Sequence, residues 1–212
     1  MRAFLIGWMC LLLMLWAGPV VAEDLNPPPW DAGLPNQTSQ AWECTGQPLP
    51  VVDLPPMIDE NPFGLAGLTL TGADEIQVIP GPRGDPIPTW HIGPGGGTIS
   101  IYVPNSPMPN SMKLVFWQIT SDQGLGPASS QPPGTNLPPP YPQGMWLTDN
   151  WYTYNGLIQI VPNPEGETIT FPVQESTNIS EIVIDTVCTV PEPATLSLLA
   201  LGALGLVLRR RL

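Results

Sequence analysis

The sequence predicts an all-β protein, an antiparallel β-sandwich of the jelly-roll type, with an N-terminal signal helix and a C-terminal membrane helix. Between residues 65 and 187, short β-prone runs alternate with turn residues, and no amphipathic helical pattern occurs among them. Short strands at this spacing are typical of sandwiches and jelly rolls. Eight tryptophans can fill a core, which counts against disorder despite 30 prolines and 21 glycines.

The N-terminus has the three parts of a secretory signal peptide. Arg2 precedes the apolar run FLIGWMCLLLMLW, and small residues follow at Val20 and Ala22. We therefore expect residues 1–22 to be removed after Ala22. The alternative is a buried N-terminal helix of the mature domain.

Residues 23–62 predict a proline-rich lead-in to the domain. They contain nine prolines and no helical period. We expect an extended segment that crosses the surface and is anchored by Trp30, Trp42 and Cys44. The β-sandwich domain is predicted over residues 63–189.

Nine β-prone runs follow in order along this domain. MKLVFWQIT is apolar on both faces and is therefore expected to be a central strand covered on both sides. In ETITFPV, Ile169, Phe171 and Val173 should share the buried face. Residues 121–144, rich in proline and glycine, should form a long exposed loop. The nine runs are LAGLTLT, EIQVI, PTWHI, TISIYV, MKLVFWQIT, WYTY, LIQIV, ETITFPV and EIVIDTV.

The segment WYTY-NG-LIQI predicts a β-hairpin. Asn155-Gly156 between two β-prone runs is the preferred pair for a type I′ turn. In that hairpin Trp151, Ile158 and Ile160 share the apolar face, while the wetter face carries Tyr152, Tyr154, Leu157 and Gln159.

This wetter face is the candidate ligand-binding site. Tyr152 and Tyr154, with Trp146 just before them, could stack on sugar rings, and the amide of Gln159 could bind hydroxyls. The alternative is that the same face packs against the second sheet or under the proline-rich loop.

Cys44 and Cys188 lie near the two ends of the exported domain. An even number of cysteines in an oxidising compartment predicts a disulfide, here one that would join the first strand region to the last. A metal site is not expected at these cysteines, because no histidine or third cysteine lies nearby in the sequence.

No catalytic motif is present, and we expect the protein not to be an enzyme. His91 is the only histidine and has no nucleophile motif near it, so a structural hydrogen bond is expected. The acid pairs Asp59-Glu60 and Asp74-Glu75 lie among turn residues, and neighbours on a strand point apart, which disfavours paired-carboxylate chemistry. No cofactor is expected. A structural calcium ion at Asp185 or Asp53 lacks the support of a binding-loop motif.

The charge distribution excludes nucleic acid as a partner. The formal net charge is -12, and four of the six basic residues lie at the chain ends, namely Arg2 and Arg209 to Arg211. Nucleic-acid binding depends on lysines and arginines that neutralise phosphates. The acidity therefore favours solubility outside the cell.

The C-terminal tail predicts a short membrane helix. Residues 194–208 carry no charge and would rise about 22 Å as a helix, less than the usual hydrocarbon thickness. The three terminal arginines should stay in the cytoplasm. Before any processing, the tail would hold the exported domain at the inner membrane.

Pro191-Glu192-Pro193, the apolar run and Arg209-Arg210-Arg211 together resemble the PEP-CTERM sorting signal of Gram-negative bacteria. The resemblance covers only residues 190–212. It implies recognition by an exosortase, a membrane transpeptidase, and a destination at the cell surface or in an exopolysaccharide matrix. It implies nothing about the activity of the exported domain. A plain tail anchor is the alternative.

These observations lead us to expect a non-catalytic surface or matrix protein, with polysaccharide as the candidate ligand. Two alternatives stay open. A passive structural or adhesive protein would have its aromatic rings buried. A secreted glycoside hydrolase would bring two acids, or His91 and a partner, together in a cleft.

Overall fold

The computed structural model describes residues 26–31, 34, 36–82, 84–106, 112–141, 145–146 and 150–189. These residues form an all-β structure, and none of their segments is a helix long and apolar enough to cross a membrane. The predicted signal helix and the predicted C-terminal membrane helix lie outside the described residues. The strands are β1 (Gln37–Glu43), β2 (Val51–Leu54), β3 (Ile58–Asp59), β4 (Gly67–Thr71), β5 (Ala73–Pro80), β6 (Pro86–Ile92), β7 (Gly97–Pro104), β8 (Met112–Ser121), β9 (Ser129–Gln131), β10 (Thr135–Leu137), β11 (Met145–Trp146), β12 (Tyr152–Ile160), β13 (Gly166–Val173) and β14 (Asn178–Thr189).

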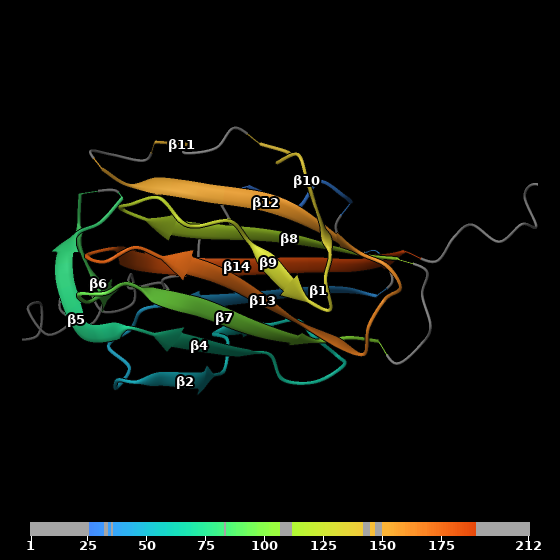
Figure 1. Cartoon of the computed structure of the whole chain (residues 1–212), viewed down its shortest axis with the longest axis horizontal. Coiled ribbons are helices and arrows are strands. Elements are labelled where there is room, and N and C mark those ends of the chain that lie inside the picture. The colour runs from blue at the N-terminus through green and yellow to red at the C-terminus, as the bar shows by residue number, and fades with distance from the viewer. Residues whose placement is uncertain are drawn as a thin grey trace, which may run out of the picture.

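The strands form two antiparallel sheets that pack face to face (Figure 1). The nine-stranded large sheet has the order β10-β12-β8-β14-β1-β3, with β11 paired to β12, β6 paired to β14, and β5 paired to β6. The five-stranded small sheet has the order β2-β4-β7-β13-β9. The chain changes sheet between β7 and β8, β12 and β13, and β13 and β14, as in a jelly roll. The predicted fold class is confirmed for the described residues.

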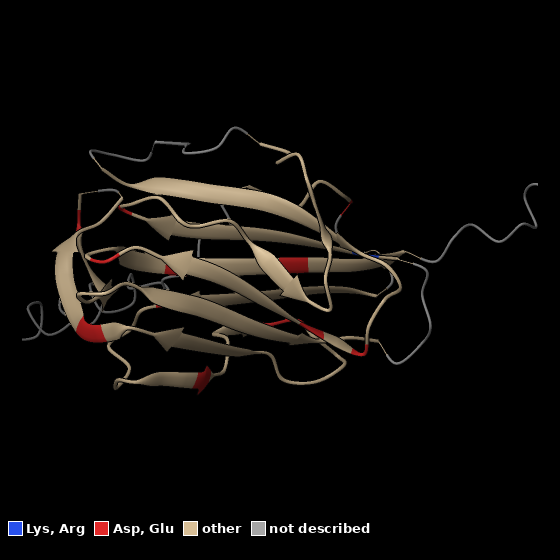
Figure 2. Ribbon diagram, in the orientation of Figure 1, with Lys and Arg blue, Asp and Glu red and all other residues tan. Residues whose placement is uncertain are grey.

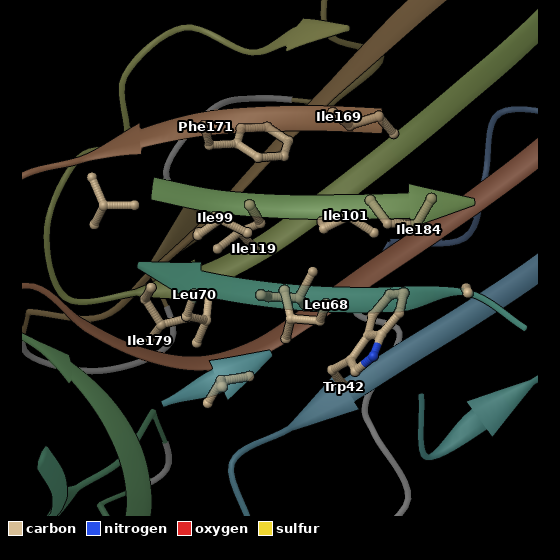
Figure 3. Close-up of a cluster of buried hydrophobic side chains, with 14 of the residues drawn as sticks. Trp42, Leu68, Leu70, Ile99, Ile101, Ile119, Ile169, Phe171, Ile179 and Ile184 are labelled. Carbon is tan, nitrogen blue, oxygen red and sulfur yellow. The ribbon is translucent and has the colours of Figure 1, made fainter. Parts of the chain in front are cut away.

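The core lies between the two sheets (Figure 3). It is built from alternate residues of each strand, because successive side chains on a strand point to opposite faces. In β13, Ile169, Phe171 and Val173 are buried as predicted, and they face Ile182 and Ile184 of β14 within the same cluster.

The other face of the large sheet is also covered, which explains why β8 is apolar on both sides. The backbone N–H of Asn26 donates to Gln118 Oε1 at 3.0 Å, and Gln118 Nε2 donates to the carbonyl of Asn26 at 2.8 Å. The Tyr141 hydroxyl donates to the carbonyl of Pro27 at 2.6 Å, and its ring packs edge-on against Phe116. β8 is therefore a central strand covered on both faces, as its sequence predicts.

The boundary predicted at residue 62 does not separate a lead-in from the sandwich. β1 pairs with β14 over its whole length, from Gln37 opposite Val187 to Glu43 opposite Glu181. Trp42 is fully buried, and its Nε1 donates to the carbonyl of Leu54 at 2.9 Å. None of the prolines of this region lies within β1, β2 or β3, because they precede β1, separate the three strands or follow β3, so they bound the strands without preventing them.

The predicted hairpin at Asn155-Gly156 is wrong. β12 runs unbroken from Tyr152 to Ile160 and pairs throughout with β8, so that Asn155 lies opposite Gln118 and Gly156 opposite Trp117. Neither residue has the positive φ that a type I′ turn needs. Both residues are buried. An uninterrupted strand lets their backbone N–H and C=O groups form hydrogen bonds with the neighbouring strands, which buried backbone groups need.

The predicted disulfide is also wrong, because no disulfide joins Cys44 to Cys188 and both side chains are buried apart. The strand register gives the physical reason. The N–H of Cys44 donates to Ser180 of β14, whereas Cys188 lies eight residues farther along that strand, about 26 Å away. A disulfide requires Cα atoms within about 7 Å.

The described surface is acidic (Figure 2). Lys113 is the only lysine or arginine among the described residues, and its side chain is fully buried. No exposed basic side chain in this part of the chain is therefore available to bind phosphate groups.

Candidate binding groove

A groove of about 310 Å³ opens where β8 and β12 meet β10 and the segment that precedes β9. β8 and β12 supply an aromatic floor, made by Trp117 and Tyr154, the segment before β9 supplies an apolar wall, and Asn136 of β10 supplies an amide. The volume lies at the lower end of the range for small-ligand sites. The lining residues are Trp117, Leu125, Gly126, Pro127, Ala128, Asn136, Leu137, Pro139, Tyr154, Asn155, Gly156 and Leu157.

Gly156 determines where the Trp117 ring lies. A Cβ atom at residue 156 would come within 2.4 Å of the Trp117 ring, so only glycine lets the indole lie across β12. On its other side the indole meets Phe171 of the small sheet edge-on, with ring centroids 4.8 Å apart. The glycine and the phenylalanine together hold Trp117 half-buried at the floor of the groove.

Tyr154 forms the second aromatic surface. Its ring centroid lies 6.0 Å from that of Tyr152, at an interplanar angle of 40°. Burial raises the pKa of the Tyr154 phenol, and the nearby Tyr152 and Asp122 raise it further. The phenol therefore stays neutral and able to donate a hydrogen bond at any physiological pH.

Two polar groups in the groove are open to a ligand. No described residue accepts a hydrogen bond from Trp117 Nε1, and this atom is not sealed from solvent. The amide nitrogen of Asn136 donates to the carbonyl of Ala128 at 2.9 Å, which orients the amide and leaves its oxygen as an acceptor. The groove thus offers aromatic planes, a hydroxyl, an indole N–H and an amide, and no charge.

Of the four residues predicted to bind ligand, only Tyr154 lines this groove. Tyr152 lies beside it on the same face of β12. Gln159 lies on the opposite face and donates to Met112 Sδ. Trp146 pairs with Tyr152 through its backbone, and its side chain is outside the described structure.

Sequence reasoning missed Trp117 because it interpreted MKLVFWQIT only as core. The groove depends on the pairing of Trp117 with a glycine on the neighbouring strand. That pairing is visible only once Asn155-Gly156 is recognised as part of a strand. A glycine within a β-prone run, which often marks close approach of another group, was the available signal.

A second cluster joins Asp74, Glu75 and His91 on the paired strands β5 and β6. One ligand atom from each lies within 4.8 Å of the others. A register shift between Ala73 and Glu75 breaks the alternation that would have pointed the two acids apart. His91 Nδ1 shares a hydrogen bond with Asn178 Oδ1 at 3.2 Å, which is a hydrogen bond of the kind predicted for this histidine.

Asp185 and Asp53, the two acids considered for calcium, lie on different sheets. Asp185 is buried on β14 opposite Phe116, whereas Asp53 is exposed on β2. They do not form one site.

Residues 189–211 match the family model of the PEP-CTERM protein-sorting motif. The chain therefore carries a PEP-CTERM tail. This motif marks a protein that a Gram-negative bacterium exports, anchors transiently in the membrane and sorts through an exosortase. The PEP-CTERM match covers the tail alone and leaves the activity of the sandwich to be argued from its own residues.

Among solved structures, the chain is similar to the C-terminal CBM6 of LamC, a marine laminarinase from Zobellia galactanivorans. The two share 16% identity, the match covers 56% of this chain and 98% of the other, and the TM-score is 0.28. A TM-score this low leaves the fold assignment resting on the two sheets described above. No curated protein is significantly similar to the chain.

Proposed function

We propose that the protein is a non-catalytic component of the cell surface or exopolysaccharide matrix that binds polysaccharide in the groove formed by Trp117, Asn136 and Tyr154. The observation that carries the proposal is the pairing of two aromatic planes with uncharged hydrogen-bonding groups in one open groove. The C–H faces of sugar rings suit aromatic planes, while hydroxyls suit amides and N–H donors.

The chemistry of the groove favours binding over hydrolysis. Glycoside hydrolysis generally needs two carboxyl groups on either side of the scissile bond. The described residues that line the groove include no acid and no histidine, and Tyr154 is their only ionisable side chain. The Asp74, Glu75 and His91 cluster lies on β5 and β6 and contributes nothing to this lining.

The PEP-CTERM tail supports the surface or matrix destination. A protein sorted to the outside of the cell meets polysaccharide at high local concentration, so even a shallow site with modest affinity is occupied. The excess of acidic over basic residues, coloured red and blue in Figure 2, favours neutral glycans over strongly anionic ones, because like charges repel.

The test is retention of the exported protein by a panel of soluble and insoluble polysaccharides, followed by tryptophan fluorescence titration. We expect one neutral glycan class to be retained and to perturb Trp117 emission. Tyr154→Ala should lose that binding, whereas Tyr102→Ala, a change at an exposed tyrosine of the small sheet, should keep it.

Two outcomes would replace the proposal. Release of reducing ends from the retained glycan would identify a glycoside hydrolase. Failure of a correctly folded protein to bind any glycan of the panel would identify a passive structural or adhesive protein.

A further inference from the structure

A second polar site lies sealed inside the sandwich, at the end of β8 away from Ser121. Lys113 of β8 points inward from the large sheet. Glu167 of β13 points inward from the small sheet and meets it, with Lys113 Nζ 2.7 Å from Glu167 Oε1. Both side chains are completely shielded from solvent. Asn105, which follows β7, is the third member and is also buried.

The Glu167 carboxyl group contacts the other two side chains through different oxygens. Oε1 faces Lys113 Nζ, whereas Oε2 accepts a hydrogen bond of 2.5 Å from Asn105 Nδ2. The same Nδ2 also donates to the carbonyl of Pro164 at 2.9 Å, which fixes the plane of the amide. One carboxyl group therefore holds an amine and a primary amide side by side.

The cluster is incompletely satisfied as an ion pair. Glu167 is the only described group that forms an ion pair with Lys113 Nζ, although an ammonium group carries three N–H donors. Asn105 Oδ1 is buried without a hydrogen-bond partner among the described residues. Two buried charges with so few partners cost more in desolvation than their attraction returns.

Burial also favours the uncharged forms of both groups. It lowers the pKa of Lys113, against the opposing effect of Glu167 and a weaker one of Cys188. It raises the pKa of Glu167, against the effects of Lys113 and Asn105. An amine that has lost its proton is a nucleophile.

We propose that Lys113 and Asn105 form an intramolecular isopeptide bond, with Glu167 as the general acid and base. Lys113 Nζ gives a proton to Glu167 Oε1 and attacks Asn105 Cγ. The new bond is Nζ–Cγ, and the bond that breaks is Cγ–Nδ2. Loss of this first proton turns the Lys113 ammonium into the attacking amine. After the attack, Nζ gives a second proton to the carboxyl group while Glu167 Oε2 delivers one to Nδ2, which leaves as ammonia, so that Glu167 ends protonated. The step needs no oxidant, cofactor or added reactant.

The position of Glu167 suits this proton relay. The oxygen beside the attacking nitrogen collects the proton, and the oxygen beside the departing nitrogen returns it. Effective positioning of this kind supplies much of the barrier reduction in intramolecular reactions. The product would join the end of β7 in the small sheet to the start of β8 in the large sheet and would remove both buried charges.

The test is the intact mass of the purified full-length protein, with its thiols reduced, and a chymotryptic peptide map. We expect the mass to be lower, by one ammonia molecule, than the mass calculated for the protein between its observed termini, with a branched peptide that joins Asn105 to Lys113. Lys113→Arg and Glu167→Gln should restore the full mass. Asn105→Asp should form the same amide with loss of water. Glu165→Gln, a change at an exposed neighbour, should leave the bond intact.

The wild-type map decides the matter even where a core variant does not fold. A folded wild-type protein at full sequence mass would overturn the proposal. A mass loss that persists in Lys113→Arg would also overturn it, because an asparagine succinimide loses ammonia without a lysine. A branched peptide that still forms in Glu167→Gln would overturn the role given to Glu167.

Discussion

Lys113 and Trp117 lie four residues apart on the same inward face of β8, yet one ends in a sealed polar cluster and the other in an open groove. The difference comes from their neighbours. Lys113 is covered from the opposite sheet by Glu167, whereas Trp117 lies beside a glycine on β12. A single strand can therefore supply a site that stabilises and a site that binds. The choice depends on the side chains that adjoining strands place against it.

The largest effect should come from breaking the sealed cluster. Glu167→Ala prevents the proposed bond between Lys113 and Asn105 and leaves the Lys113 amine buried without a partner, so we expect the free energy of unfolding to fall by at least about 3–5 kcal/mol. Chemical denaturation measures this loss. Glu165→Ala is the matched control, because Glu165 is exposed and its replacement should change stability little. If both variants lost the same unfolding free energy, burial of the Glu167 carboxyl group would not be the reason for the effect.

A smaller effect should follow from filling the space that glycine leaves at the groove. In Gly156→Val the new side chain would collide with the Trp117 ring, and we expect about 1–3 kcal/mol of destabilisation, as for other overpacked cores. Thermal unfolding and tryptophan emission should both change. Gly124→Ala is the control, since its nearest neighbour to a Cβ would be the Tyr154 hydroxyl at 3.9 Å. An unchanged emission spectrum in Gly156→Val would show that Trp117 does not depend on the glycine.

Substitutions in the groove beside Trp117 should weaken glycan binding more than they lower the stability of the fold. Removing the Tyr154 ring should weaken glycan binding about tenfold, which corresponds to roughly 1.4 kcal/mol. Titration by tryptophan fluorescence gives the ratio of dissociation constants. Tyr154→Phe keeps the ring and should lose less. If the phenylalanine variant were as weak as the alanine variant, the hydroxyl rather than the ring would carry the contact.

The groove should respond little to pH. Its only described ionisable group is Tyr154, whose pKa is raised above the ordinary tyrosine value of about 10, so the phenol stays protonated from about pH 5 to about pH 9. Dissociation constants measured across this range should agree. A titration step near neutral pH would place a histidine or carboxyl group in the binding site and contradict the groove as described.

The smallest effect is expected from reductant. Because no disulfide joins Cys44 to Cys188, adding a thiol reductant should not shift the unfolding midpoint. The thiols should react with a thiol reagent only after unfolding, since both are buried. A lower midpoint in reductant would indicate a disulfide that the register of β1 and β14 forbids.

Most of the sandwich was predictable, and the errors have physical causes. The alternation of apolar and polar residues identified β7, β8, β13 and β14. Successive side chains on a strand point to opposite faces, so the same two-residue period appears in the sequence and in the burial. The hairpin prediction at Asn155-Gly156 was wrong because this pair of residues is compatible with a turn and with a buried strand. Which of the two forms depends on Trp117, which lies on another strand. The disulfide prediction was wrong because the positions of the two cysteines in the sequence do not reveal how β1 is aligned against β14.

The candidate site was predictable only in part for the same reason. Tyr154 was identified because it is an aromatic residue on an alternating strand. Trp117 and Asn136 were not, since their shared groove depends on how β8, β10 and β12 lie together. The buried Lys113, Glu167 and Asn105 come from three separate strands or strand ends and leave no motif in the sequence.

The burial of Lys113 has a consequence for survival outside the cell. Proteases of the trypsin type cut after lysine or arginine, and the described surface presents neither. Such an enzyme would find no bond to cut on that surface until the sandwich opens. Cleavage after Lys113 would then follow the population of the opened sandwich, and it would follow the rate of unfolding only where protease is in excess.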